Sequence, residues 1–217
     1  MSELSSTHSS CEPTIFTTLV HFPNASEKIK TQDFIQASSA AVDLITQFGK
    51  VFAAVVNDMN ENIQKVLSIY EKDKERNEGN EYLEDMILKE QIEGENIATD
   101  SLMWLKRELH FVSLFYQYVI EDSQNERVSN DLGTFLKKAY AETLEPFQGW
   151  LGSQLFNVLS RFTPNRRNLV FILGLEKPNR DQDVMSDLLG YNNNMMACVR
   201  RLTNFYSEYG LETFATV

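Results

Sequence analysis

The stretch S-L-M-W-L-K-R-E-L-H-F, residues Ser101–Phe111, opens the most apolar run of this 217-residue chain. Apolar residues return every three or four positions as far as Ile120, which is the repeat of an α-helix. They cover two adjoining sides and leave only a narrow polar strip of Lys106, His110, Ser113 and Gln117. A helix this apolar is buried or lines a hydrophobic chamber. The run therefore predicts a helix over about residues 97–121, with Trp104 in the core or facing such a chamber.

A second helix carries polar groups in an equally regular row. In V-V-N-D-M-N-E-N-I-Q-K-V, residues Val55–Val66, Asp58, Asn62 and Lys65 fall at i, i+4 and i+7. That spacing places them on one helical face, at the border of the apolar arc. Two interpretations stay open. The row is either a polar rim facing solvent, or a set of hydrogen-bonding groups at the mouth of an apolar cavity.

The rest of the chain shows the same helical repeat, without alternating strand patterns. Residues 1–29 are rich in Ser and Thr and predict a flexible or loosely docked segment. From residue 30 to 217 we expect a single all-α domain with about eight helices. A loop is expected at K-P-N-R-D-Q-D, residues 177–183. The predicted helices cover about residues 31–48, 50–71, 81–94, 97–121, 130 to a break at Pro146, 149–162, 168–175 and 191–209.

Composition narrows the classes of partner and the compartment. The formal net charge of -11 argues against nucleic acid, whose phosphates need a basic face, and against lasting attraction to anionic membranes. A brief membrane contact through apolar residues remains allowed. Cys11 and Cys198 are too sparse for a disulfide framework or a zinc site. No apolar run approaches the roughly 20 residues of a membrane span, and no signal peptide is evident, so we expect a cytoplasmic protein.

Catalytic motifs are missing from the sequence. The three histidines are scattered, and there is no H-E-x-x-H pair, no G-x-S-x-G and no glycine-rich phosphate loop. We therefore expect no catalytic residue, no metal and no cofactor. An acid, an amide and an ammonium beside a tryptophan are instead suited to hold a neutral headgroup rich in hydroxyls.

Three segments together resemble the glycolipid transfer protein family. The first, D-M-N-E-N-I-Q-K (Asp58–Lys65), matches the family's D-x-x-x-N-x-x-K, and the second, L-M-W-L-K-R (Leu102–Arg107), matches L-x-W-L-K-R. The third, A-Y-A-E-T-L-E-P-F-Q-G-W-L-G-S-Q-L-F, looks like the family's segment with His-Gly-Trp. The resemblance covers roughly residues 30–217.

The resemblance implies a two-layer all-α fold that encloses one lipid. Asp58, Asn62 and Lys65 would then bind the sugar headgroup, with Asp58 also at the ceramide amide N–H, and Trp104 would be the platform for the first sugar ring. Gln148 stands where the family has His, and its N–H could still reach the ceramide carbonyl. Trp150 would contact the membrane. The chain pocket would be lined by Phe52, Val55, Phe111, Phe115, Leu144 and Phe156.

By this resemblance the chain is a non-enzymatic, monomeric carrier that moves a glycosphingolipid between membranes. A related branch that binds a phosphate headgroup has arginine where this chain has Trp104, and Asp100 nearby would repel a phosphate. Two alternatives remain. One is a carrier of ceramide-1-phosphate or another sphingolipid, and the other is a lipid sensor or adaptor that does not transfer its lipid.

Overall fold

Helices make up all the regular structure in the part of the chain that the computed structural model describes, residues 12–49, 53–76, 81–147, 156–157 and 160–213. These residues form seven α-helices and three single-turn 3-10 helices, as the predicted all-α class requires. The 3-10 helices are η1 (Ile15–Thr17), η3 (Glu145–Phe147) and η4 (Ser160–Phe162). The α-helices are α1 (Thr31–Thr46), α2 (Ala53–Glu75), α3 (Leu83–Glu93), α4 (Ile97–Asp122), α5 (Gly133–Thr143), α7 (Arg166–Leu173) and α8 (Asp181–Glu208).

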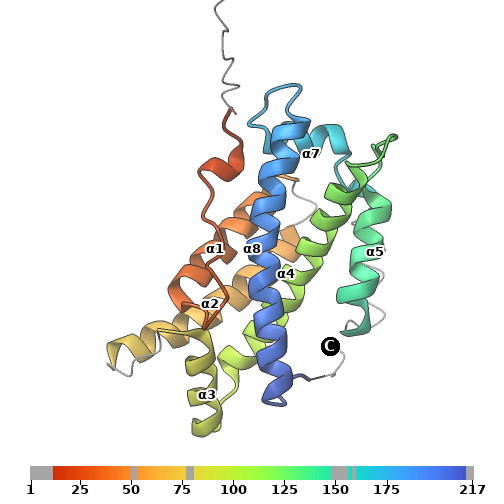
Figure 1. The fold of residues 1–217 in the computed structure, drawn as a ribbon. Helices are drawn as coiled ribbons and strands as arrows, with labels where there is room; N and C mark the ends of the chain where they lie inside the picture. The colour runs from red at the N-terminus through yellow and green to blue at the C-terminus, as the bar shows by residue number, and fades with distance from the viewer. Residues whose placement is uncertain (1–11, 50–52, 77–80, 148–155, 158–159, 214–217) are drawn as a thin grey trace, which may run out of the picture.

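Helix α4, the apolar helix of the sequence, lies at the centre of the fold. It packs against α2, α5 and α8 and touches α3, while α1 packs on α2. Figure 1 shows α1 and α2 crossing behind α8, with α4 and α5 beside α8, which gives the two layers. Most of α4 is buried because nearly every turn of it meets a neighbouring helix. No helix among the described residues is long and apolar enough to cross a membrane.

Both ends of α4 are tied down by charged side chains. At its start, the Glu90 carboxylate accepts hydrogen bonds from the backbone N–H groups of Ala98 and Thr99, each at 2.7 Å. A carboxylate is favoured there because the first N–H groups of a helix lack partners and the helix dipole is positive. At its end, Arg166 Nη2 donates to the Val119 carbonyl at 3.0 Å and to Asp122 Oδ2 at 2.6 Å. The position of Trp104, in between, is thereby fixed.

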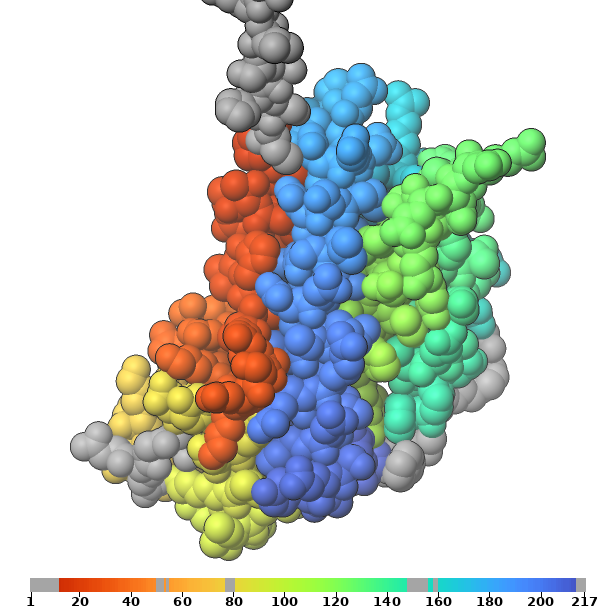
Figure 2. Space-filling view, in the orientation of Figure 1, coloured from red at the N-terminus to blue at the C-terminus, as the bar shows by residue number. Residues whose placement is uncertain are grey.

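The N-terminal segment from Glu12 onward is docked along α8 rather than loose. Phe16, Phe22 and Ile29 are buried, although the surrounding sequence is rich in Ser and Thr. The Phe16 ring centroid lies 5.2 Å from that of Tyr191 on α8. Figure 2 shows this segment packed side by side with α8. Residues 1–11 of the segment predicted to be flexible or loosely docked lie outside the described residues, and residues 12–29 are packed against the helices.

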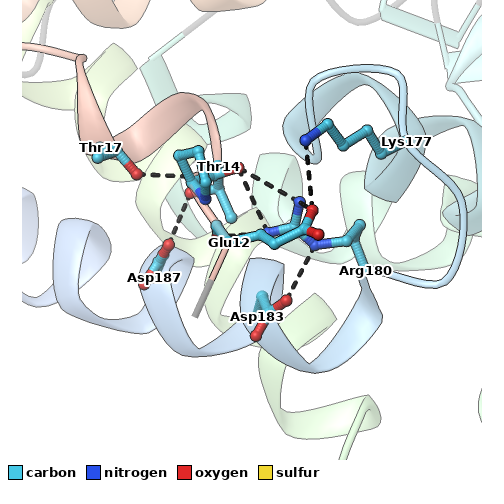
Figure 3. A network of polar contacts seen from close by, with 8 residues as sticks. Glu12, Thr14, Thr17, Lys177, Arg180, Asp183 and Asp187 are labelled. Atoms are coloured by element: carbon cyan, nitrogen blue, oxygen red, sulfur yellow. Dashed lines mark hydrogen bonds and ion pairs between the residues drawn. The ribbon is translucent and has the colours of Figure 1, made fainter. Parts of the chain in front are cut away.

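A polar network joins the start of this segment to α8, and we call it the N-terminal clasp (Figure 3). Thr14 Oγ1 donates to Asp187 Oδ2 at 2.6 Å. Arg180 contacts Glu12 Oε2 at 3.3 Å and Asp183 Oδ2 at 2.9 Å, and it also donates to the backbone carbonyls of Glu12 and Pro13. The clasp consists of Glu12, Thr14, Thr17, Lys177, Arg180, Asp183 and Asp187.

Two predicted boundaries were wrong. Helix α8 begins at Asp181, ten residues before the predicted start at 191, so the predicted loop over 177–183 ends inside it. Asp181 and Asp183 in its first turn suit the positive end of the helix dipole. The fifth predicted helix stops at Thr143, and the turn at Pro146 is the 3-10 helix η3. Most of the predicted helix over 149–162 lies outside the described residues.

Candidate functional site

The polar row on α2 sits where α2 meets α4. Met59, Ile63 and Val66 point inward and are buried, which turns Asp58 and Asn62 to the border of the α2–α4 contact. Asn62 is only 7% exposed, whereas Asp58 and Lys65 are exposed. The row is therefore neither a wholly solvated rim nor a wholly buried cluster, because its middle member is covered while its ends are open.

Glu108 on α4 connects this row to the other helix. Its side chain is 5% exposed, and Asn62 Nδ2 donates to its Oε2 over a long 3.4 Å. Burial raises the pKa of the Glu108 carboxyl well above its usual range, and a hydrogen bond and the charge of Asp58 raise it further, while Asn62 acts against them. Glu108 therefore faces both Asp58 and Asn62 across the contact between α2 and α4. The sequence analysis did not single out Glu108.

Trp104 belongs to the same site because it lies one helical turn before Glu108 on α4. It is half-buried and packs against the core. The Arg107 guanidinium lies over its ring, 5.0 Å from the centroid, and also 3.7 Å from the Phe147 ring centroid in η3. One face of the indole is thus covered by a cation. A sugar ring stacking on Trp104 would use the opposite face.

Two members of the narrow polar strip on α4 are buried rather than exposed to solvent. Ser113 is fully buried and donates to Asn192 Oδ1 at 2.7 Å, while Lys106 is 3% exposed. Lys106 is covered because Glu212, just after α8, contacts its ammonium group. Burial and the neighbouring Arg107 lower the pKa of Lys106 to about 8.

Arg107 takes part in the same C-terminal contact. Its Nη2 donates to Glu212 Oε2 at 3.0 Å and to the Thr213 carbonyl at 2.6 Å. The side chain is 5% exposed, and its Nη1 has no hydrogen-bond partner among the residues described. The segment after α8 therefore closes over the side of α4 that carries Lys106 and Arg107, next to Trp104.

Apolar residues continue the site along the same side of α4. Trp104, Glu108, Phe111 and Phe115 are spaced by four, three and four positions, so they share one face. Phe111 and Phe115 are buried, and Phe111 lies 5.9 Å from the Phe156 ring, which stacks on Tyr140 at 3.7 Å between centroids. This face is therefore polar and aromatic at one end and wholly apolar at the other.

Of the remaining residues predicted to line the chain pocket, Leu144 is buried in the core and Val55 is partly buried against it. Phe52, Gln148 and Trp150 lie outside the described residues. Among the residues described, no group of three or more His, Cys, Asp or Glu side chains could hold a metal ion. An arrangement of hydrogen-bonding groups leading into an apolar face is suited to bind an amphiphile.

Comparison with known proteins agrees with this geometry. Residues 29–174 match the family model described as glycolipid transfer protein (GLTP). The chain belongs to the glycolipid transfer protein family. Members of this family are lipid transfer proteins. Proteins with the same fold include carriers of glycolipid and carriers of ceramide-1-phosphate.

Relatives and solved structures extend the match. The chain is 30% identical to human pleckstrin homology domain-containing family A member 8 over 85% of its own length and 36% of that protein. It is 24% identical to the glycolipid transfer protein of Danio rerio, over 85% of this chain and 90% of the relative. A structure of FAPP2, described as selecting simple glycosphingolipids with a GLTP fold, superimposes with a TM-score of 0.80 at 27% identity. That match covers 94% of this chain and 100% of the FAPP2 chain.

Two limits follow from these matches. The chain spans well under half the length of the first curated relatives, 39% of human putative protein PLEKHA9 and 36% of the pleckstrin homology protein. Human ceramide-1-phosphate transfer protein shares the fold, with a TM-score of 0.72 over 87% of this chain and 91% of that one, at only 15% identity. At that identity the likeness shows the fold alone. The headgroup that this glycolipid transfer protein family member binds must therefore be argued from its own residues.

Glu108 and Glu212 are the residues of this family member that sequence reasoning missed. Glu108 carried a signal, since an acid one turn after Trp104 interrupts the apolar face of α4. Glu212 carried none, because its role depends on how the chain turns after α8. Gly210 makes that turn at φ 66°, a left-handed conformation that glycine adopts without strain.

Proposed function

We propose that this protein binds a sphingolipid with a neutral sugar headgroup and carries it between membranes without chemical change. The observation that supports the proposal most strongly is the order of residues along one face of α4. Trp104 lies one turn before Glu108, which meets Asp58 and Asn62 from α2, and Phe111 and Phe115 follow at the other end. A sugar joined to two hydrocarbon chains has the same order of polar and apolar parts.

The headgroup end offers both kinds of hydrogen-bonding partner that a sugar needs. Asp58 is exposed, so its carboxylate can accept from sugar hydroxyls or from the ceramide amide N–H. Lys65 is an exposed donor one turn beyond Asn62, and the open face of Trp104 can stack on the C–H face of the ring. Gln148, as a donor to the ceramide carbonyl, and Trp150, as a membrane contact, complete the proposal on the strength of the family resemblance.

A phosphate headgroup suits this site less well. The two buried cations beside Trp104, Lys106 and Arg107, are already engaged with the Glu212 carboxylate. The groups that remain at the α2–α4 border include two acids, Asp58 and Glu108. A phosphate placed there would be repelled by the Asp58 charge.

Transfer between vesicles tests the proposal. We expect Trp104→Ala and Asp58→Val each to slow transfer of a fluorescent galactosylceramide roughly 10- to 100-fold, because a lost charge-assisted hydrogen bond or stacking contact costs on the order of 1.5–3 kcal/mol. The helical circular dichroism should persist. Asp43→Val, which replaces an exposed acid on α1, is the matched control and should transfer normally.

Three results would overturn parts of the proposal. Wild-type rates in both site variants would remove Asp58 and Trp104 from the headgroup site. Faster extraction of ceramide-1-phosphate than of galactosylceramide would reassign the headgroup. Tight binding of galactosylceramide without release to acceptor vesicles would favour a sensor or adaptor.

A further inference from the structure

Glu108 occupies a buried position, where an acid lowers the stability of the fold. It is 5% exposed, and the groups that contact it among the described residues are Asp58 and Asn62, both from α2. The cations next to it in sequence, Lys106 and Arg107, are occupied by Glu212 instead. A buried acid that meets a second acid, with no cation in contact, is costly for folding. Its presence one turn from Trp104 therefore calls for a role in the site.

We infer that Glu108 is a positioning residue of the headgroup site: from α4 it contacts Asp58 and Asn62 of α2, and so holds Asp58 as a hydrogen-bond acceptor for the lipid. This inference rests on the proposed function. Asp58 is exposed and lies at the edge of α2, where an unsupported carboxylate would sample several rotamers. A bond from Glu108 selects one of them before the lipid arrives, which lowers the entropy lost on binding.

The contact with Glu108 also orients the side-chain amide of Asn62. Its Nδ2 donates one hydrogen to Glu108 Oε2, so its side-chain oxygen and the second amide hydrogen remain for the ligand. Asp58 and Asn62 are thereby both oriented by a single side chain of the opposite helix.

This arrangement makes the site sensitive to alkaline pH. Burial and Asp58 raise the pKa of Glu108, and among the described groups that contact it only Asn62 acts in the opposite direction. When Glu108 ionises, it loses the proton that it donates, and two like charges then face each other across the α2–α4 border. Asp58 is released from its rotamer, and transfer of the lipid slows.

Two substitutions of Glu108 distinguish a positioning role from a packing role. Glu108→Gln keeps the shape and an N–H donor for Asp58 but cannot ionise, whereas Glu108→Ala removes the donor. At pH 7 we expect galactosylceramide transfer by Glu108→Gln to stay within about threefold of wild type, and that of Glu108→Ala to fall about tenfold, the effect of one lost hydrogen bond to a charged group. As pH rises, the wild-type rate should fall while the Glu108→Gln rate stays level.

A second measurement does not depend on transfer. In the lipid-free protein, a ¹³C NMR titration of the side-chain carboxyls should show that the pKa of Glu108 is raised above its usual range and that it falls when Asp58 is replaced by Asn. A Glu108 carboxyl that titrates in its usual range, or identical pH profiles of transfer for wild type and Glu108→Gln, would overturn the inference. If the wild type moves no glycolipid at any pH, the proposed function fails, and the NMR titration still decides whether Glu108 donates to Asp58.

Discussion

The N-terminal clasp and the Asp58–Asn62–Glu108 cluster are both partly buried polar groups that join two segments, yet they are built in opposite ways. In the clasp each charge meets an opposite charge or a hydroxyl, as Arg180 does with Glu12 and Asp183 and as Asp187 does with Thr14. In the cluster two acids meet, and the other polar contact seen in the described part of the chain is a long bond from Asn62 to Glu108.

The contrast distinguishes polar groups that stabilise the fold from polar groups whose cost the packing of the fold must offset. Paired charges and short hydrogen bonds stabilise the contact in which they lie. Two acids in a protected site do not, so the surrounding packing of α2 on α4 must compensate for them. Strongly shifted acids of this kind gather at functional sites because function, and not stability, requires them there. The clasp should therefore respond to mutation in stability alone, and the cluster in transfer.

The largest stability effect is expected at the centre of the clasp. Arg180→Met removes the ion pairs to Glu12 and Asp183 and the bonds to two backbone carbonyls, and should lower the free energy of unfolding by about 1–3 kcal/mol. For a domain of this size that corresponds to a melting temperature lower by roughly 2–4 °C per kcal/mol. Lipid transfer per folded molecule should not change.

Lys177→Met is the matched control for Arg180. Lys177 also pairs with Glu12, but both side chains are more than half exposed, so its loss should cost no more than about 1 kcal/mol. Denaturant unfolding of the two variants beside the wild type makes the comparison. A loss of transfer in Arg180→Met under conditions where it is fully folded would show that the clasp also shapes the site.

Because of the cluster, the free energy of unfolding should depend on pH. The pKa of Glu108 is raised in the folded state, so its contribution to stability is complete below the unfolded pKa and is lost as pH rises through the folded pKa. Glu108→Gln removes that loss. Relative to wild type, its free energy of unfolding should increase as pH rises from 5 to 9.

Thermal melts across this pH range would measure the difference, with Glu61→Gln as the control. Glu61 is exposed on α2, and its substitution should leave the pH dependence unchanged. If Glu108→Gln and wild type lose stability in parallel as pH rises, the two acids do not share a proton.

The smallest effect is expected at the edge of the clasp. Thr14→Val keeps the shape of a fully buried side chain but removes the 2.6 Å bond from its hydroxyl to Asp187. It should lower the free energy of unfolding by about 0.5–1.5 kcal/mol, the usual net value of one hydrogen bond. Thr18→Val is the control, because Thr18 is exposed and bonds only to a carbonyl of its own turn. Equal unfolding curves for the two variants would mean that the Thr14–Asp187 bond adds nothing to the clasp.

Regular apolar spacing made most of the fold predictable. Helix α4 begins at the predicted residue, and α1 and α3 lie within two residues of theirs, because their apolar residues follow the helical repeat. The start of α8 was missed because K-P-N-R-D-Q-D reads as a loop by composition. Val184, Leu188, Tyr191 and Met195 do follow a helical spacing, and all four are buried.

The site was predictable only as far as it depended on single helices. The row of Asp58, Asn62 and Lys65 and the position of Trp104 follow from spacing within one helix. That Glu108 meets Asp58 depends on how α2 crosses α4, and that Glu212 covers Lys106 depends on the turn at Gly210. Neither contact leaves a local signal, because its two residues are remote in the sequence.

The docked N-terminal segment also has a consequence for the order in which the protein is made. Thr14 and Asp187 are 173 residues apart. At about 5–20 residues per second, a ribosome needs roughly 9–35 s to reach Asp187 after Thr14 has been added. During that interval Phe16 and Phe22 have been synthesised, but Tyr191, the ring that both pack against, has not. The first aromatic residues of the docked segment are thus among the last to find their place, and the nascent chain must be kept from aggregating through them until α8 has emerged.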